Sequence, residues 1–150
     1  MLKTQLAFTA TIYVGEAQEI GQTAKGTRRI IPILGGEFSG ERLSGVVLPG
    51  GADWQLIRLD GVAEIEALYT MKEQDGTLIY IANRGFRHGP KEVMQRLGRG
   101  QIVPPEEYYF RTTPSFEVAT GKHDWLTHTV FVGQGERTPE SVKFTFYEVL

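Results

Sequence analysis

The sequence predicts an all-β fold, a single antiparallel β-barrel over residues 1–150 with one short helix near residues 90–97. Three observations favour this fold class. Apolar and polar residues alternate in several runs with the two-residue period of β-strands. Glycine makes up 18 of the 150 residues and separates these runs at intervals that suit an all-β domain. The final run, 141–149, is rich in aromatic and β-branched residues, and pairing with the first strand would close the sheet and remove its edges.

The first expected strand covers residues 4–14, where every second residue from Leu6 to Val14 is apolar. The same alternation returns from Ala63 to Met71. Such runs predict strands with two different faces. The remaining strands are expected at 27–34, 37–48, 53–59, 62–72, 77–83, 107–112, 115–119, 126–132 and 141–149.

Turn and helix signals complete the predicted order of elements. Asp75-Gly76 stands between two alternating runs, which is a strong indication of a β-hairpin. Gly133 and Gly135 are expected, like most of the other glycines, to mark turns or bulges. Pro90 suits the first position of a helix and Gly98 lies just past its end, so residues 90–97 are expected to form about two helical turns.

Composition excludes several classes of function. The 16 Lys and Arg residues against 18 Asp and Glu give a net charge of −2, so nucleic acid is not an expected partner, because phosphate-driven binding needs a concentrated positive field. The absence of cysteine excludes disulfides and thiol chemistry. No apolar run is long enough for a membrane-spanning helix, so no membrane partner is expected. The N-terminus lacks the pattern of a secretory signal, which favours a cytoplasmic protein.

No motif for a cofactor or a metal stands out. The glycine pairs at 35–36 and 50–51 are not followed by the helix that nucleotide-binding loops need. A zinc site without cysteine would require several converging histidines or carboxylates. The chain has three histidines, His88, His123 and His128, and the last two are expected on opposite faces. We therefore expect neither a cofactor nor a metal.

Polar residues lie inside aromatic-rich runs in four places, at residues 26–29, 52–55, 82–85 and 108–112. An arginine buried in a strand is costly unless it pairs with a carboxylate or faces a wet cavity. One interpretation is a set of ion pairs that tie strands together. The other is a polar site inside the barrel, because alternate residues of a closed barrel share one interior.

Alternation allows some of these polar residues to converge. Asp53 and Gln55 share one face of their strand, opposite Trp54, and Tyr109 shares a face with Arg111. If Asp53, Gln55 and Arg111 point inwards, they form a cavity for a small ligand with a carboxylate or phenol and a flat apolar body. Asp53 would then act as a general base, with Arg111 stabilising an enolate or carboxylate.

Glu117 and His128 are the reserve candidates for acid–base catalysis. For Trp54 and Trp125, stacking on a ligand competes with an ordinary place in the core. The residues expected to bind the ligand are Arg28, Trp54, Gln55, Tyr69, Asn83, Arg84, Tyr109 and Trp125.

Four segments together resemble a bacterial family catalogued as domain of unknown function 3237, also named UPF0311. They are Gly45–Gln55, Asn83–Gly85, Gly89-Pro90 and Tyr108–Thr112, and the resemblance extends over nearly the whole chain, from about Gly26 to Val149. It implies a small antiparallel β-barrel of lipocalin-like appearance. It brings no established activity, so no functional residue is carried over from it.

Three functions remain open from the sequence. The first is a cofactor-independent acid–base enzyme, a lyase, isomerase or cyclase, acting on a small anionic, oxygenated or aromatic metabolite. The second is a binding barrel without chemistry, a carrier or sensor of a similar ligand. The third is a structural or subunit-contact role in which the arginines bridge strands. A homodimer is compatible with all three, although nothing in the chain identifies its interface.

Overall fold

The computed structural model describes residues 1–150, and its ten strands all belong to one antiparallel sheet. An α-helix and two short 3₁₀ helices, η1 (Pro105–Glu107) and η2 (Asp124–Thr127), complete the structure. The strands are β1 (Thr4–Val14), β2 (Gln18–Thr23), β3 (Gly26–Gly40), β4 (Ser44–Val47), β5 (Ala52–Ile57), β6 (Ala63–Glu73), β7 (Leu78–His88), β8 (Tyr109–Val118), β9 (Phe131–Arg137) and β10 (Ser141–Val149).

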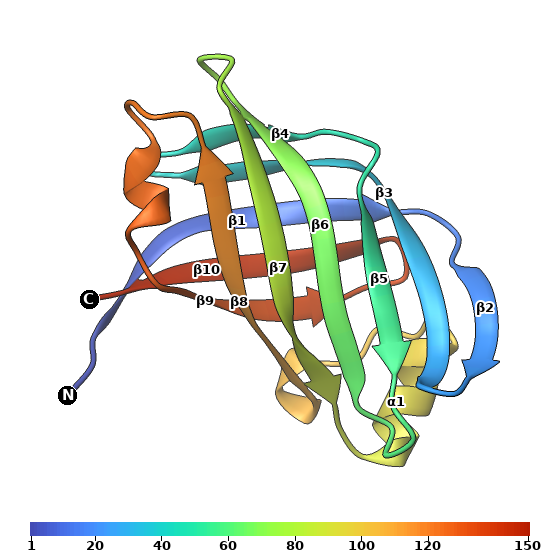
Figure 1. Ribbon diagram of the computed structural model, residues 1–150. Helices are drawn as coiled ribbons and strands as arrows, with labels where there is room; N and C mark the ends of the chain where they lie inside the picture. Colours follow the sequence, from blue (N-terminus) through green and yellow to red (C-terminus); the bar gives the residue numbers. More distant parts are fainter.

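The sheet closes into a barrel, as predicted. Its strands follow the order β1-β10-β9-β8-β7-β6-β4-β3, and β3 pairs back onto β1. Because β4 and β5 share the position between β3 and β6, the wall has eight strand positions. The expected pairing of the first and last strands is confirmed, with Thr4 opposite Val149 and Tyr13 opposite Ser141. In Figure 1, β6, β7 and β8 cross in front of β1, β9 and β10.

The barrel interior holds the hydrophobic core, a cluster of 24 buried apolar residues. Alternation produces it directly, since every second residue of β6 from Ala63 to Met71 is buried. Aromatic rings from facing strands fill much of the space. Phe8 packs on Phe146 with ring centroids 4.9 Å apart, and Phe110 packs edge-on against Phe144 at 5.3 Å.

Glycines inside strands cause most of the differences from the predicted elements. Residues 27–34 and 37–48 were expected as separate strands, but β3 continues through Gly35 and Gly36 and ends at Gly40. Gly36 has a φ of 153°, and a Cβ there would overlap the carbonyl oxygen of Thr11 on β1. Glycine at this position therefore lets β1 approach β3 where it closes the barrel.

The strand predicted at 126–132 is displaced along the chain. Residues Asp124–Thr127 form η2, and β9 runs from Phe131 to Arg137 through both Gly133 and Gly135. These two glycines lie under aromatic rings, because an added Cβ would come within 2.9 Å of the Phe146 ring and 2.8 Å of the Phe110 ring, respectively. Core packing, rather than a turn, requires glycine here.

Two further differences from the predicted elements concern β8 and β2. The segments predicted at 107–112 and 115–119 are a single strand, β8, and β2 was not predicted. The hairpin at Asp75-Gly76 is confirmed, as it joins β6 to β7. The predicted helix is α1 (Lys91–Gly98), preceded by Pro90.

Helix α1 lies at one end of the barrel and η2 at the other (Figure 1). It follows β7 directly, so it is placed beside the end of the barrel where β7 terminates. At eight residues it is too short to cross a membrane, and the structure contains no longer helix.

Candidate active site in the barrel interior

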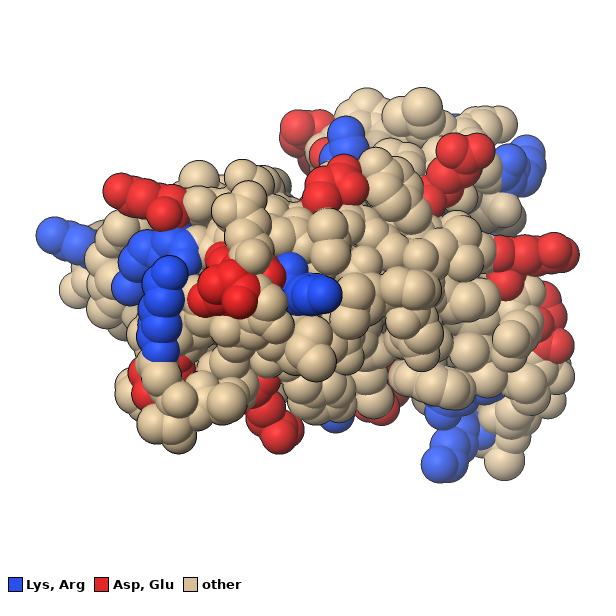
Figure 2. All heavy atoms as spheres, turned by 90° about the horizontal axis from the view of Figure 1, so that it is seen from above, with Lys and Arg blue, Asp and Glu red and all other residues tan.

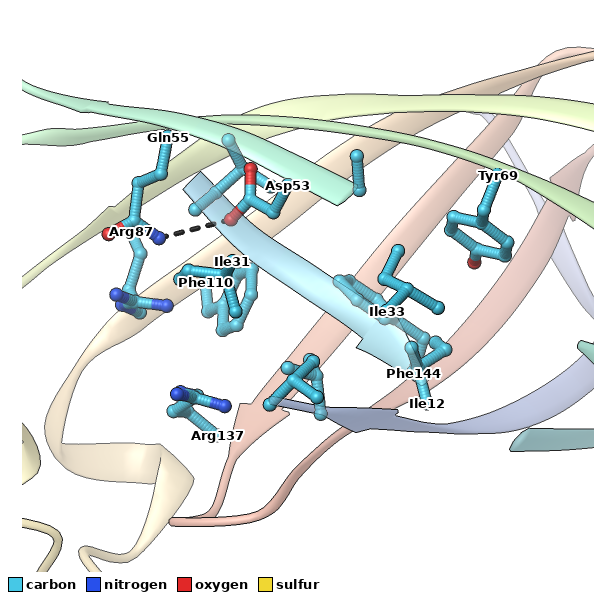
Figure 3. A pocket seen from close by; sticks show the side chains of 14 residues that line it. Ile12, Ile31, Ile33, Asp53, Gln55, Tyr69, Arg87, Phe110, Arg137 and Phe144 are labelled. Atoms are coloured by element: carbon cyan, nitrogen blue, oxygen red, sulfur yellow. Dashed lines mark hydrogen bonds between the residues drawn. The ribbon is translucent and has the colours of Figure 1, made fainter. Parts of the chain in front are cut away.

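A narrow cavity extends into the barrel from the end near α1. Fourteen residues line it and ten of them are hydrophobic; the polar ones are Asp53, Gln55, Arg87 and Arg137. Figure 3 shows these four side chains grouped toward one end, with apolar side chains along the rest of the cavity. Small-molecule sites commonly have this composition, an apolar lining with a few convergent polar groups.

Asp53 is the acidic group of this cavity. It lies on β5, and its side chain accepts hydrogen bonds from the backbone N–H of Glu66 at 3.0 Å and from Gln55 Nε2 at 3.0 Å. Burial raises the pKa of the Asp53 carboxyl above its ordinary value, although both hydrogen bonds and the charges of Arg87 and Arg137 act in the opposite direction. A carboxylate with a raised pKa accepts protons more readily than an exposed aspartate.

Gln55 orients the carboxylate. Its side chain is fully buried, and its Oε1 accepts a hydrogen bond from Arg29 Nη1 at 3.2 Å. Arg29 in turn pairs with Glu19 on β2 at 2.9 Å. Because the guanidinium can only donate, it fixes the amide with its oxygen toward Arg29 and its NH₂ toward Asp53. A chain of contacts from the barrel exterior thus holds Asp53 in place.

Arg87 and Arg137 supply positive charge at the same end. Five arginines form no salt bridge, and of these only Arg87 and Arg137 line the cavity; the other three are Arg28, Arg99 and Arg111. Burial, together with the charge of Arg137, lowers the pKa of Arg87 to about 10, and burial lowers that of Arg137. Both remain charged at neutral pH, so two half-buried cations face a cavity without an anion paired to either.

The arginines also border a solvent-open cleft outside the cavity. Arg29, Arg87 and Arg137 line it together with Met94 and Leu97 of α1. The guanidinium of Arg87 lies 5.3 Å from the ring centroid of Phe110, which belongs to the cavity wall. An anion that enters through this cleft meets the arginines before it reaches Asp53.

A second polar group faces the interior at the level of Asp53. Asn83 on β7 is fully buried, and neither its Oδ1 nor its Nδ2 has a hydrogen-bond partner. It is the cross-strand partner of Ala67 on β6, which is itself the partner of Asp53 on β5. Directly opposed residues point to the same side of a sheet. Asn83 therefore offers a carboxamide to the interior.

The structure confirms which predicted residues share a face of a strand, but it does not bring Arg111 close to Asp53. Asp53 and Gln55 share one face of β5 opposite Trp54, as the alternation predicted, and the structure shows that this face is the inner one, with Trp54 exposed outside. Tyr109 and Arg111 also share a face, but it is the outer one. The alternating set that includes Phe110 fills the barrel, because its aromatic rings pack in the core, and this places Arg111 outside.

Most of the other predicted residues also lie outside the cavity. Arg28, Trp54 and Arg84 line a shallow depression on the outer surface, where Arg84 pairs with Glu66. Glu117 and His128 are exposed. Trp125 is half-buried on η2, packed against Phe131 and covered by the guanidinium of Arg42 at 3.6 Å. Of the predicted site residues, those that face the interior are Asp53, Gln55, Tyr69 and Asn83.

Sequence reasoning missed the three arginines. Arg87 lies in the part of β7 beyond the predicted end at residue 83, and Arg137 lies in the part of β9 beyond 132. In the cluster at residues 26–29 the sequence predicts Arg28 as the ligand contact, whereas Arg29 lines the cleft beside Arg87 and Arg137. The signal that could have found Arg29 is its spacing to the buried Ile31 and Ile33, which share its face of β3.

One group of side chains has the composition of a metal site. Ligand atoms of Glu73, Asp75 and His123 all lie within 4.8 Å of one another. However, the oxygens of Glu73 accept hydrogen bonds from the backbone N–H groups of Ser44 and Asp75, and Asp75 accepts one from His123 Nε2 at 2.8 Å. In this arrangement the group ties the β6–β7 turn to the segment before η2.

Comparison with known proteins places this barrel in a family. Residues 2–149 match the family described as "Protein of unknown function (DUF3237)". The chain belongs to this family. A UPF0311 protein of Rhodopseudomonas palustris is 44% identical over 149 residues, covering 99% of this chain and 97% of that protein. The resemblance noted in the sequence is thereby confirmed.

Solved structures agree with the DUF3237 barrel. A crystal structure of a conserved R. palustris protein of unknown function has a TM-score of 0.95 at 43% identity and covers 100% of this chain and 98% of its own. A "beta-barrel like protein" from Acinetobacter baumannii reaches 0.87 at 37% identity, with 100% and 97% covered. An enzyme from Penicillium herquei reaches 0.74 at 16% identity, with 99% and 95% covered, and at that identity only the fold is shared.

Proposed function

We propose that this DUF3237 barrel binds a small organic anion in its interior and that Asp53 acts on the bound molecule as a general base. The observation that supports the proposal is that Arg87 and Arg137, which have no carboxylate partner, line the same cavity as Asp53. Two half-buried guanidinium groups repel each other and have lost part of their hydration. A carboxylate, enolate or phenolate between them offsets both costs through charge-assisted hydrogen bonds.

Charge outside the cavity is distributed differently. On the face shown in Figure 2, basic side chains lie among acidic ones, so no continuous patch of either sign forms there. Several exposed arginines are also paired with carboxylates, for example Arg58 with Asp60 and Arg42 with Glu148. A small anion is therefore expected to prefer the barrel interior to the surface.

The reaction class that fits these groups is proton abstraction from a carbon next to a carbonyl group. The C–H bond breaks, its proton passes to an Asp53 lone pair that neither Gln55 nor Glu66 occupies, and its electron pair forms an enolate. Arg87 and Arg137 offset the negative charge. Return of the proton to another carbon gives an isomerase, while loss of a leaving group or ring closure gives a lyase or cyclase.

Burial makes Asp53 suited to this role. A general base is most effective when its pKa lies near the working pH, and burial moves the Asp53 pKa in that direction. Asn83 is a second candidate contact, because its unpartnered Nδ2 can donate to a developing oxyanion. The enzyme from Penicillium herquei shares the fold, so a barrel of this kind is compatible with catalysis. A cytoplasmic location and a homodimer remain predictions from the sequence.

Binding is tested first by thermal unfolding against a panel of oxo acids, phenols and aromatic acids. An acid at a hundred times its Kd should raise the free energy of unfolding by about 2.7 kcal/mol. Proton abstraction is then tested by NMR in D₂O, because a base that removes a C–H proton exchanges it for deuterium.

Exchange should disappear in Asp53→Asn and persist in Glu117→Gln, whose side chain is on the outer face. Binding by the wild-type protein without exchange would contradict the catalytic half of the proposal and indicate a carrier or sensor. A flat response to the whole panel would contradict the binding half.

A further inference from the structure

The inner part of the cavity contains a polar atom that the proposed chemistry does not use. Tyr69 on β6 is 3% exposed and lines the cavity, and its hydroxyl has no hydrogen-bond partner in the protein. Figure 3 shows its ring at the opposite end of the cavity from Arg87 and Arg137, with Ile33 and Phe144 beside it.

An unpartnered hydroxyl in an apolar cavity is unfavourable, since it has lost its bonds to water without replacement. Phenylalanine would fill the same volume without this cost. Burial also raises the pKa of Tyr69 well above its usual range, so the hydroxyl stays neutral and can both donate and accept. The tyrosine therefore indicates a polar atom in whatever occupies this part of the cavity.

The register of β6 and β7 gives the order of groups along the cavity. Arg87 is paired with Ala63, Asn83 with Ala67, and Ile81 with Tyr69. Tyr69 lies six positions after Ala63, which corresponds to a rise of about 20 Å along the strand. A molecule that lies along this wall meets the cations first, the Asp53–Asn83 level next and Tyr69 last.

We propose that the bound molecule is a slender acid with a second oxygen, a hydroxyl or carbonyl, at the end opposite its acid group, and that this oxygen hydrogen-bonds to Tyr69. The inference rests on the proposed function for the position of the acid group at Arg87 and Arg137. The body of the molecule is mainly apolar, because ten of the fourteen residues that line the cavity are hydrophobic, Ile31, Ile33 and Phe144 among them.

Calorimetric titration with matched acids tests this assignment. The probes are cinnamate, 4-hydroxycinnamate, whose hydroxyl is at the far end, and 2-hydroxycinnamate, whose hydroxyl is near the acid. Octanoate and 8-hydroxyoctanoate repeat the comparison with a narrower body. Each is titrated into the wild-type protein, into Tyr69→Phe and into Tyr80→Phe, a control whose exposed ring lies on the other face of β7.

The wild-type protein should bind 4-hydroxycinnamate or 8-hydroxyoctanoate about tenfold more tightly than the parent acid, the effect of one hydrogen bond. This preference should be absent for 2-hydroxycinnamate, lost in Tyr69→Phe and kept in Tyr80→Phe. If the wild-type protein binds the acids without preference, or if Tyr69→Phe keeps the preference, the inference is overturned and the proposed function stands. If none of the five acids binds, both are overturned.

Discussion

Asp53 and Asn83 flank the same residue on the inner face of the barrel. Asp53 on β5 and Asn83 on β7 are both cross-strand partners of Ala67 on β6, so their Cβ atoms are about 10 Å apart. The short side chain of Ala67 leaves room between them. A ligand over Ala67 would have a carboxylate on one side and a carboxamide on the other, which is a suitable arrangement for removing a proton and holding an oxyanion.

Filling this gap should block the site. In Ala67→Val, two added methyl groups would occupy the space between Asp53 and Asn83. We expect binding of any acid found in the panel to weaken at least tenfold, measured by titration, with a loss of about 1–3 kcal/mol in the free energy of unfolding. A variant that folds and binds with unchanged affinity would place the ligand in the outer cleft beside α1 instead.

Asp53 should give the protein a characteristic dependence on pH. Because its pKa is raised on folding, the native state binds more protons than the unfolded state above about pH 4, the ordinary aspartate value. The free energy of unfolding contributed by this group therefore falls as pH rises from about 4 through the folded-state pKa. Urea unfolding at several pH values should show Asp53→Asn gaining stability relative to the wild-type protein over this range.

The same group sets the pH dependence of turnover. Deuterium exchange should increase with pH along a limb centred above about 4 and reach a plateau once Asp53 is ionised. Asp53→Asn should lower the plateau by a factor of about 10² to 10⁴. If the midpoint of this limb lay at the ordinary aspartate pKa, the raised pKa of Asp53 would be contradicted. If Asp53→Asn exchanged deuterium at the wild-type rate, Asp53 would have no part in the mechanism.

Arg87 and Arg111 form a matched pair for testing the anion site. They lie on neighbouring strands, but Arg87 faces the cavity and Arg111 faces solvent. Arg87→Met should weaken binding of an anionic ligand about ten- to hundredfold, since a charge-assisted hydrogen bond contributes about 1.5–3 kcal/mol. Arg111→Met should bind normally. Equal losses in the two variants would indicate a general effect of net charge.

Tyr69 and Tyr108 should respond oppositely to loss of the hydroxyl. Both are buried, but Tyr108 accepts a hydrogen bond from the backbone N–H of Arg137 at 2.9 Å, whereas the hydroxyl of Tyr69 has no partner. In the ligand-free protein, Tyr69→Phe should raise the free energy of unfolding by about 1 kcal/mol and Tyr108→Phe should lower it by a similar amount. Denaturant unfolding measures both, and a loss of stability in Tyr69→Phe would show that its hydroxyl is satisfied.

Much of the barrel followed from alternation alone, because a half-buried strand must present one face to the core. That rule placed Asp53 with Gln55 and opposite Trp54, and it predicted the closing pair β1 and β10. It could not say which face of β8 is inside. Tyr109 and Phe110 are both aromatic, and only the packing of Phe110 against Phe144 decides the matter.

Arg87 and Arg137 could not be predicted as site residues because both lie near the end of a strand, and local sequence patterns define strand ends poorly. In the sequence, Gly85 and Gly133 look like residues that end a strand, yet both lie within strands. Arg87 follows Gly85 by two residues on β7, and Arg137 follows Gly133 by four on β9. A Cβ at Gly85 would overlap the backbone oxygen of Arg111 on β8. The reason for glycine is thus contact with a neighbouring strand, which is a property of the closed barrel rather than of the local sequence.

Gly135 tests this explanation directly. Its φ is not in the left-handed region, so Gly135→Ala adds no backbone strain, but the new Cβ would lie 2.8 Å from the Phe110 ring. We expect a loss of about 1–3 kcal/mol in the free energy of unfolding, partly restored in the double variant with Phe110→Leu, which removes the crowding ring. Gly98→Ala is the control, because nothing lies within 4 Å of a Cβ there and alanine favours the helix by about 0.5–1 kcal/mol. If Phe110→Leu and Gly135→Ala were simply additive, the ring would not be what requires glycine, and the path of β9 past Phe110 would need another cause.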